Sequence, residues 1–247
     1  MESYTDFAFC YDRLTENVDY KSRAEHICQI MNQCNHDPGV CLDLACGTGN
    51  ITLELAKRGI DVFGVDGSPE MLSVAQQKLS EHGYDVLLIC QMMQNLELYS
   101  TVDTVICCLD SINHITDPKD VQSTFDGVSK HLNSNGYFIF DVNTIYKHRN
   151  VLSNNTFVYD VDDVFCVWQN DFEDETNIVT INLDLFEPDG DAYYRSSEEF
   201  CERAYSIEQL VGMLERSGFE VVGIYDDMSF NKPKQDSERI IFVARKK

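Results

Sequence analysis

Basic residues are scarce in this sequence relative to acidic ones. Lys and Arg together number 19 against 42 Asp and Glu, which gives a formal net charge of −23 at pH 7. A surface with this charge repels a phosphate backbone unless a local basic patch overrides the repulsion, and the sequence contains no cluster of Lys and Arg. The composition therefore disfavours a nucleic-acid partner and favours a small-molecule substrate.

Long apolar runs are also missing. No window approaches eighteen apolar residues, and the amino terminus lacks the basic region followed by an apolar run that marks a secretion signal. The sequence has 10 cysteines, but they are scattered through apolar runs without a C-x-x-C pair or a mixed Cys/His cluster. We therefore expect a cytoplasmic protein with reduced cysteines, no membrane association and no bound metal.

Alternating strand and helix patterns indicate the fold class. The apolar run Val40–Leu44 enters a glycine-rich turn, and residues 51–58 have helical spacing. Residues 60–66 form a second strand pattern, and Ser68–Pro69 supplies the cap and first-turn proline of the next helix. Strand patterns recur at 85–90, 104–109, 137–141, 219–224 and 239–244. Helix patterns occur at 117–132 and at 206–217, where Ser206 and Gln209 can form a capping box. This order predicts a doubly wound, Rossmann-like α/β fold with a seven-stranded, mostly parallel sheet whose last strand is antiparallel.

Residues 156–203 break the helical pattern. Apolar and polar residues alternate along 179–185, which is typical of a half-buried antiparallel strand, and strand patterns at 164–172 and 192–203 flank it across polar turns. We interpret this region as an inserted antiparallel β-meander. The expected organisation is a helical cap at 1–36, a cofactor-binding core at 37–150 and 204–247, and a substrate-covering insertion at 151–203.

Side chains of the inserted meander are candidates for the wall of an acceptor pocket, because an insertion at the carboxyl edge of the sheet is well placed to cover a ligand. The candidates are Trp168, Tyr193, Tyr194, Arg195 and Arg203. The alternative is that they are ordinary surface residues of the strands, and that Arg203 is an ion-pair partner in this acidic chain.

The turn after the first strand has the chemistry of a nucleotide-like cofactor site. Its glycines let the backbone approach a ligand closely and aim free helix amides at it. Asp66 ends the next strand, nineteen residues after Gly47, at the spacing that places a carboxylate on a ribose diol. A dinucleotide site would have a small residue at position 52, which is Thr, and Asp43 would repel a pyrophosphate but attract the ammonium of a methionyl group.

The turn has the sequence Asp43-Leu44-Ala45-Cys46-Gly47-Thr48-Gly49. It resembles the first motif of the class I, Rossmann-like methyltransferase superfamily. The resemblance covers residues 37–145 well and 206–245 more loosely. It implies S-adenosylmethionine as the cofactor, with residues 45–49 around its methionyl part, Asp66 on both ribose hydroxyls and Gly67 against the adenine. The cofactor-binding residues that we assign are Asp43, Ala45, Cys46, Gly47, Gly49, Asp66, Gly67, Met71, Met92, Met93 and Leu109.

The segment after the third strand departs from the family pattern. The family often has an Asp there that contacts the adenine amino group, whereas Met92 stands at that position. We expect a backbone amide of this segment and apolar packing from Met71 and Met92 to hold the adenine instead.

Polar residues follow the fourth predicted strand, in the segment 108–114. Ligands of such sheets bind at the carboxyl ends of strands, so these side chains should face the transferred methyl group. Asp110 and His114 are candidate catalytic residues, with His114 as a general base. The alternative for His114 is a hydrogen-bonded structural role, which is commoner for a lone histidine after a strand.

The aromatic-rich segment 4–14 is similar to the start of many small-molecule methyltransferases, where it folds over the cofactor. Within it, Tyr11 is the third candidate catalytic residue, as a lid or substrate contact. The alternative is an aromatic face that packs on the sheet.

Together these features predict a methyltransferase that acts on a small molecule. In-line displacement at a sulfonium carbon depends mainly on alignment and desolvation, so a catalytic triad is not required. The alternatives are a non-catalytic module that binds S-adenosylmethionine or S-adenosylhomocysteine, and a tRNA or protein methyltransferase with a local basic face. A nicotinamide-dependent oxidoreductase is disfavoured by Thr52 and Asp43.

Overall fold

Seven strands form the central sheet of the computed structural model, which describes residues 7–161 and 163–247. The strand order is β10-β11-β5-β4-β1-β2-β3, and β11 is antiparallel to both of its neighbours. The strands are β1 (Val40–Leu44), β2 (Asp61–Asp66), β3 (Leu88–Cys90), β4 (Val102–Cys107), β5 (Leu132–Asn143), β10 (Phe219–Asp226) and β11 (Arg239–Lys246). The predicted doubly wound sheet is confirmed.

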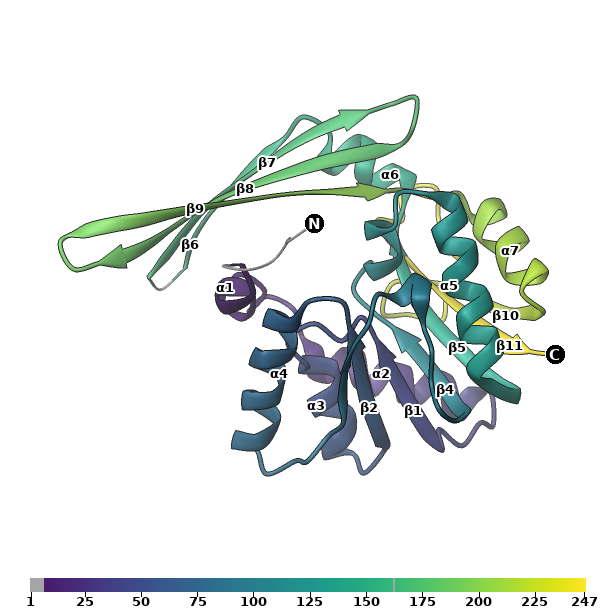
Figure 1. The fold of residues 1–247 in the computed structure, drawn as a ribbon. Helices are drawn as coiled ribbons and strands as arrows, with labels where there is room; N and C mark the ends of the chain where they lie inside the picture. Colours follow the sequence, from purple (N-terminus) through teal and green to yellow (C-terminus); the bar gives the residue numbers. More distant parts are fainter. Residues whose placement is uncertain (1–6, 162) are drawn as a thin grey trace.

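Helices cover both faces of this sheet (Figure 1). They are α1 (Phe7–Leu14), α2 (Tyr20–Gln33), α3 (Asn50–Lys57), α4 (Pro69–Glu81), α5 (Pro118–His131), α6 (Ile145–Lys147) and α7 (Ile207–Arg216), with short helices η1 (Met93–Asn95), η2 (Ser111–His114) and η3 (His148–Leu152). Side chains of β5 alternate between the two faces: Phe138 and Phe140 pack towards α5 and α7, whereas Ile139 packs towards α2 and α3. No described helix is long and apolar enough to span a membrane.

The helix starts follow the predicted capping chemistry. The Ser68 hydroxyl accepts a hydrogen bond from the Met71 amide ahead of α4, and Ser206 and Gln209 form a reciprocal capping box at α7. These local interactions satisfy amide groups that the helix itself leaves unpaired.

The inserted region is an antiparallel sheet of four strands, one more than the sequence pattern indicated. The strands are β6 (Thr156–Val161), β7 (Val164–Glu173), β8 (Ile178–Asp189) and β9 (Ala192–Arg203). The additional strand is β6, which pairs with β7 so that Val161 lies opposite Val164. Only Asp162 and Asp163 separate these strands, and two aspartates without a glycine, proline or asparagine are a weak turn signal in so acidic a chain.

The meander arches over α1, which lies between it and the body of the molecule (Figure 1). Its buried face packs against this helix and α4, with Ile181 and Leu185 in one apolar cluster with Ala8, Cys10 and Met71. The packing places the meander above the carboxyl ends of the central strands and encloses the space between them.

Candidate active site

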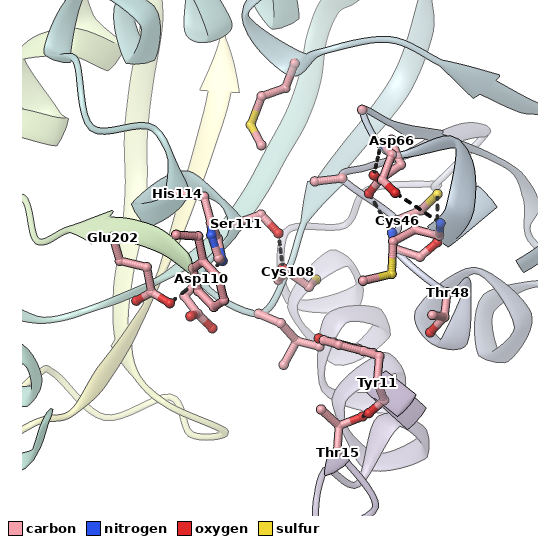
Figure 2. Close-up of a pocket in the computed structure, with 18 of the residues that line it drawn as sticks. Tyr11, Thr15, Cys46, Thr48, Asp66, Cys108, Asp110, Ser111, His114 and Glu202 are labelled. Carbon is pink, nitrogen blue, oxygen red and sulfur yellow. Dashed lines mark hydrogen bonds and ion pairs between the residues drawn. The ribbon is translucent and has the colours of Figure 1, made fainter. Parts of the chain in front are cut away.

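A cavity of about 1160 Å³ lies between the carboxyl ends of the central strands, helix α1 and the meander. Its wall contains every residue that the sequence assigned as catalytic or cofactor-binding except Gly49. These residues are Tyr11, Asp43, Ala45, Cys46, Gly47, Asp66, Gly67, Met71, Met92, Met93, Leu109, Asp110 and His114. Figure 2 shows two ends of this cavity, one with Cys46 and Asp66 and the other with Asp110, His114 and Glu202.

The glycine-rich turn after β1 passes through left-handed backbone conformations. Ala45, Gly47 and Gly49 have φ angles of 60°, 54° and 77°, in the region that glycine adopts at little cost. A Cβ at Gly47 would meet no other atom within 4 Å, so the turn leaves room for a ligand against its backbone. Gly49 instead packs on α4, where a Cβ would lie 3.0 Å from the Ala75 Cβ. Its role in the structure is close packing, outside the cavity wall.

Asp66 is held in position by the backbone around it. Its two carboxylate oxygens accept hydrogen bonds of 2.8 Å from the Gly47 and Ser68 amides. Burial raises the pKa of Asp66, and these amide bonds act in the opposite direction. Each oxygen keeps lone pairs, so the fixed carboxylate can accept from further donors in the cavity.

Asp43 is buried beneath the turn and accepts a 2.6 Å hydrogen bond from the Thr52 hydroxyl. Burial raises the pKa of Asp43 to about 7. Thr52, which distinguishes this turn from a dinucleotide fingerprint, therefore serves as the hydrogen-bond donor for the first acid of the motif.

Methionines border the part of the cavity beyond Asp66. A Cβ at Gly67 would lie 2.5 Å from the Met92 Sδ, so this position accommodates only glycine without displacing Met92. Met71 is buried, whereas Met92 is 52% exposed and Met93 packs partly against the central core. The arrangement provides apolar surface for a flat ring and no acidic side chain at position 92.

Helix α1 is tied directly to the glycine-rich turn. Its Asp12 accepts hydrogen bonds from the Thr48 hydroxyl at 2.7 Å and the Asn50 amide group at 2.8 Å, and pairs with Lys78 at 2.6 Å. These contacts hold the neighbouring Tyr11 in the cavity wall, where burial raises its pKa well above the usual value. Tyr11 is therefore a protonated phenol at neutral pH, able to donate a hydrogen bond.

A strained turn presents Asp110 to the cavity. Leu109 and Asp110 both have left-handed φ angles, 57° and 54°, which non-glycine residues rarely adopt. The Asp141 carboxylate at the end of β5 accepts 2.8 Å hydrogen bonds from both of their amides. Arg239 of β11 bridges the Asp141 and Asp110 carboxylates, and Asn143 donates to the other Asp110 oxygen at 2.8 Å.

Asp110, His114 and Glu202 form what we call the acceptor cluster. Their nearest nitrogen and oxygen atoms all lie within 4.8 Å of one another, and the His114 Nε2 is 3.8 Å from the Glu202 Oε1. Figure 2 shows the three side chains converging from the segment after β4 and from β9. Such a group has the donor atoms of a cation site, which the sequence did not indicate because Glu202 lies far along the chain.

Glu202 is a buried carboxylate, with 4% of the residue exposed. Burial acts to raise its pKa, but the nearby His148 and His114 outweigh burial and hold the pKa below its usual range. The fully buried His148 places its Nε2 3.4 Å from the Glu202 Oε2, and neither of its ring nitrogens makes a hydrogen bond with the described residues.

Sequence patterns missed Glu202, His148, Asn143 and Arg239, all of which line or support the acceptor end of the cavity. Charged residues in a β-strand pattern read as solvent-facing positions, so neither Glu202 nor Arg239 carried a usable signal.

Of the five residues of the inserted meander that were candidates for the pocket wall, one lines the cavity. Trp168 lines the cavity. Tyr193 and Tyr194 are exposed, at 68% and 59%, and Arg195 pairs with Asp184 on the sheet surface. Arg203 donates to the Thr116 carbonyl and does not line the cavity, so the interpretation of these four residues as pocket residues is wrong. Their side chains lie on or beside the meander and do not reach the enclosed space.

Comparisons with known proteins agree with this geometry. Residues 41–136 match a family described as a methyltransferase domain. The chain is 33% identical to YqeM of Bacillus subtilis (strain 168), whose name assigns it to the methyltransferases, over 98% of this chain and 97% of that protein. A solved S-adenosylmethionine-dependent methyltransferase from Clostridium acetobutylicum ATCC 824 is 39% identical with a TM-score of 0.89, over 98% of both chains.

A more distant solved structure shares the fold. CalS10 of Micromonospora echinaspora, an amino pentose methyltransferase with S-adenosylmethionine bound, has a TM-score of 0.75 at 17% identity, over 94% of this chain and 93% of that one.

Proposed function

Because the chain belongs to the class I S-adenosylmethionine-dependent methyltransferases, we propose that it methylates a small-molecule acceptor bound beneath the meander. The observation that carries this proposal is the continuous cavity that joins the glycine-rich turn and Asp66 to the acceptor cluster. At about 1160 Å³ it exceeds the roughly 300–1,000 Å³ usual for one small ligand, which leaves space for cofactor and acceptor together.

The residues at one end of the cavity fit S-adenosylmethionine. The open space at Gly47 suits the methionyl part against the turn, and the oriented Asp66 carboxylate suits the ribose diol. Gly67 and the surfaces of Met71 and Met92 suit the adenine. The bound cofactor supplies an electrophilic methyl group on a sulfonium.

At the other end, protein groups orient the acceptor and remove its proton. The strained turn held by Asp141 directs Asp110 into the cavity, and His114 supplies an imidazole, the side chain suited to proton exchange near neutral pH. Tyr11 positions the acceptor as a hydrogen-bond donor. The meander and α1 exclude water, so alignment and desolvation supply most of the rate.

Two features support a small acceptor over a macromolecule. The acceptor end is covered by the meander, and the net charge of −23 repels nucleic acids. CalS10, which is named as an amino pentose methyltransferase, has the same fold.

The first test is calorimetric titration of wild-type protein and Asp66→Ala with S-adenosylmethionine, S-adenosylhomocysteine and NAD. Loss of a charged hydrogen-bond acceptor should weaken binding of the first two by about 2 kcal/mol, or roughly 30-fold. Asp171→Ala, at an exposed strand position, is the matched control and should bind like wild type. Equal affinity of Asp66→Ala and wild type would refute the ribose assignment.

The second test measures S-adenosylhomocysteine release with panels of small acceptors, RNA and protein extracts. Release only with small acceptors supports the proposal. Release only with macromolecules refutes it, and tight cofactor binding without release on any panel favours a non-catalytic binding module.

A further inference from the structure

The buried carboxylate of Glu202 lacks a permanent cation. Among the described residues its ion pairs are with His114 and His148, at 3.8 Å and 3.4 Å, and no Lys or Arg is within ion-pair distance. Its remaining polar contact is the Asn143 amide group at 3.4 Å. A histidine carries a charge only when protonated, whereas Lys and Arg are permanently charged, so no permanent cation is paired with Glu202 among the described residues.

The cations near the acceptor cluster are already engaged. Arg239 is shared between Asp110 and Asp141, and Lys147 donates to the Asn143 side-chain oxygen at 3.1 Å, away from Glu202. Three carboxylates, those of Asp110, Asp141 and Glu202, therefore face two permanent cations. The acceptor end of the cavity has an excess of negative charge.

We propose that the acceptor is an amine, bound as an ammonium with its nitrogen among Asp110, His114 and Glu202. This inference rests on the proposed function and names its substrate class. An ammonium group supplies the missing charge together with up to three N–H donors, which match the acceptor atoms of the two carboxylates and the imidazole. An alcohol supplies one donor and no charge, and a carboxylate-bearing nucleophile would be repelled.

The cluster suits an ammonium better than a divalent metal. Both Asp110 oxygens are already hydrogen-bonded, one to the Arg239 guanidinium at 2.6 Å and one to Asn143 at 2.8 Å. The guanidinium repels a dication about twice as strongly as a monocation, so the lone pairs that remain on Asp110 favour an ammonium over a divalent metal.

The reaction then follows a balanced path. The bound ammonium gives one proton to His114, which exposes the nitrogen lone pair. That nitrogen forms its bond to the methyl carbon while the carbon–sulfur bond breaks and its electron pair remains on sulfur. The products are the methylated ammonium, S-adenosylhomocysteine and one proton, which His114 passes to solvent.

A pair of bisubstrate analogues tests the inference without knowledge of the natural acceptor. In both, nitrogen replaces the cofactor sulfur, and it carries a 2-aminoethyl arm in one and a 2-hydroxyethyl arm in the other. Calorimetry at pH 7 against wild-type protein should show the aminoethyl analogue binding at least tenfold more tightly. Equal or tighter binding of the hydroxyethyl analogue, with S-adenosylhomocysteine still bound, would overturn the proposal.

Substitutions in the acceptor cluster then test whether it causes the preference for the aminoethyl analogue. Glu202→Gln and Asp110→Asn should each reduce the amino-to-hydroxyl preference about tenfold while affinity for S-adenosylhomocysteine changes little. Glu215→Gln, on the exposed face of α7, is the matched control and should keep the full preference. A preference retained in both cluster variants would contradict the assignment, and the wild-type comparison decides the amine class even if Glu202→Gln does not fold.

Two further outcomes separate this inference from its premise. If neither the analogues nor S-adenosylhomocysteine bind, the proposed function fails and the amine inference falls with it. If equimolar Mn²⁺ binds wild type but not Glu202→Gln, and abolishes the preference for the amino arm, the cluster is a metal site and the amine inference is overturned.

Discussion

Replacing Arg239 by Met tests the ionic clamp behind the acceptor site. The guanidinium joins β11 to the carboxylates of Asp110 and Asp141, and only 12% of the arginine side chain is exposed. Met retains much of the apolar volume of Arg but lacks the positive charge. The carboxylates of Asp110 and Asp141 therefore lose the cation that they share. The strained turn that carries Asp110 then loses part of its support.

The expected cost follows from this burial. Removing one partner of a buried ion pair destabilises a protein by about 3–5 kcal/mol, because the other charge stays buried and unpaired. Each 1 kcal/mol shifts the Tm by about 2–4 °C in a domain of 150–250 residues. The Tm of Arg239→Met should therefore fall by roughly 6–20 °C, with loss of methyl transfer at temperatures where the variant is still folded.

Thermal and urea unfolding at neutral pH provide the assay. Arg245→Met is the matched control, because Arg245 lies on the same strand in an exposed pair with Glu220 and should have little effect. Adding Asp141→Asn to Arg239→Met removes one of the two unpaired charges and should recover part of the loss. Equal Tm values for Arg239→Met and Arg245→Met would refute the argument that this clamp stabilises the site.

Two further predictions concern the cofactor end of the cavity. Gly67→Val should displace Met92, because the Met92 Sδ lies 2.5 Å from the position of an added Cβ. Calorimetry should show S-adenosylhomocysteine binding weakened about tenfold, and adding Met92→Ala should restore part of the lost affinity. The raised pKa of Asp43, about 7 against 3.8, means that the folded protein holds this proton more tightly than the unfolded chain. Its stabilising contribution is present below pH 4 and decreases by about 1.4 kcal/mol per pH unit as the pH rises from about 4 to 7. Urea unfolding of the ligand-free proteins should show this decrease in the free energy of unfolding with pH for wild type and not for Asp43→Asn. The same pH dependence in wild type and variant would contradict the prediction.

Several features of the fold could be predicted because their causes are local. Ser68 with Pro69, and Ser206 with Gln209, begin helices through contacts within three residues. The alternation along 179–185 similarly identified β8 from its own period. The sequence analysis missed β6 because the only residues between it and β7 are two aspartates, which are a weak turn signal without glycine, proline or asparagine.

The sequence by itself determined the sheet, the inserted meander and the position of Asp66 beside the glycine-rich turn, nineteen residues after Gly47 in one βαβ unit. Contacts of this range follow from the periodicity and turns of a single supersecondary unit. Only the tertiary structure decided the acceptor end, where Glu202 meets His114 and Arg239 reaches Asp110 across 129 positions. Those contacts depend on how the meander packs over α1 and how β11 enters the sheet beside β5, and no local pattern of residues contains that information.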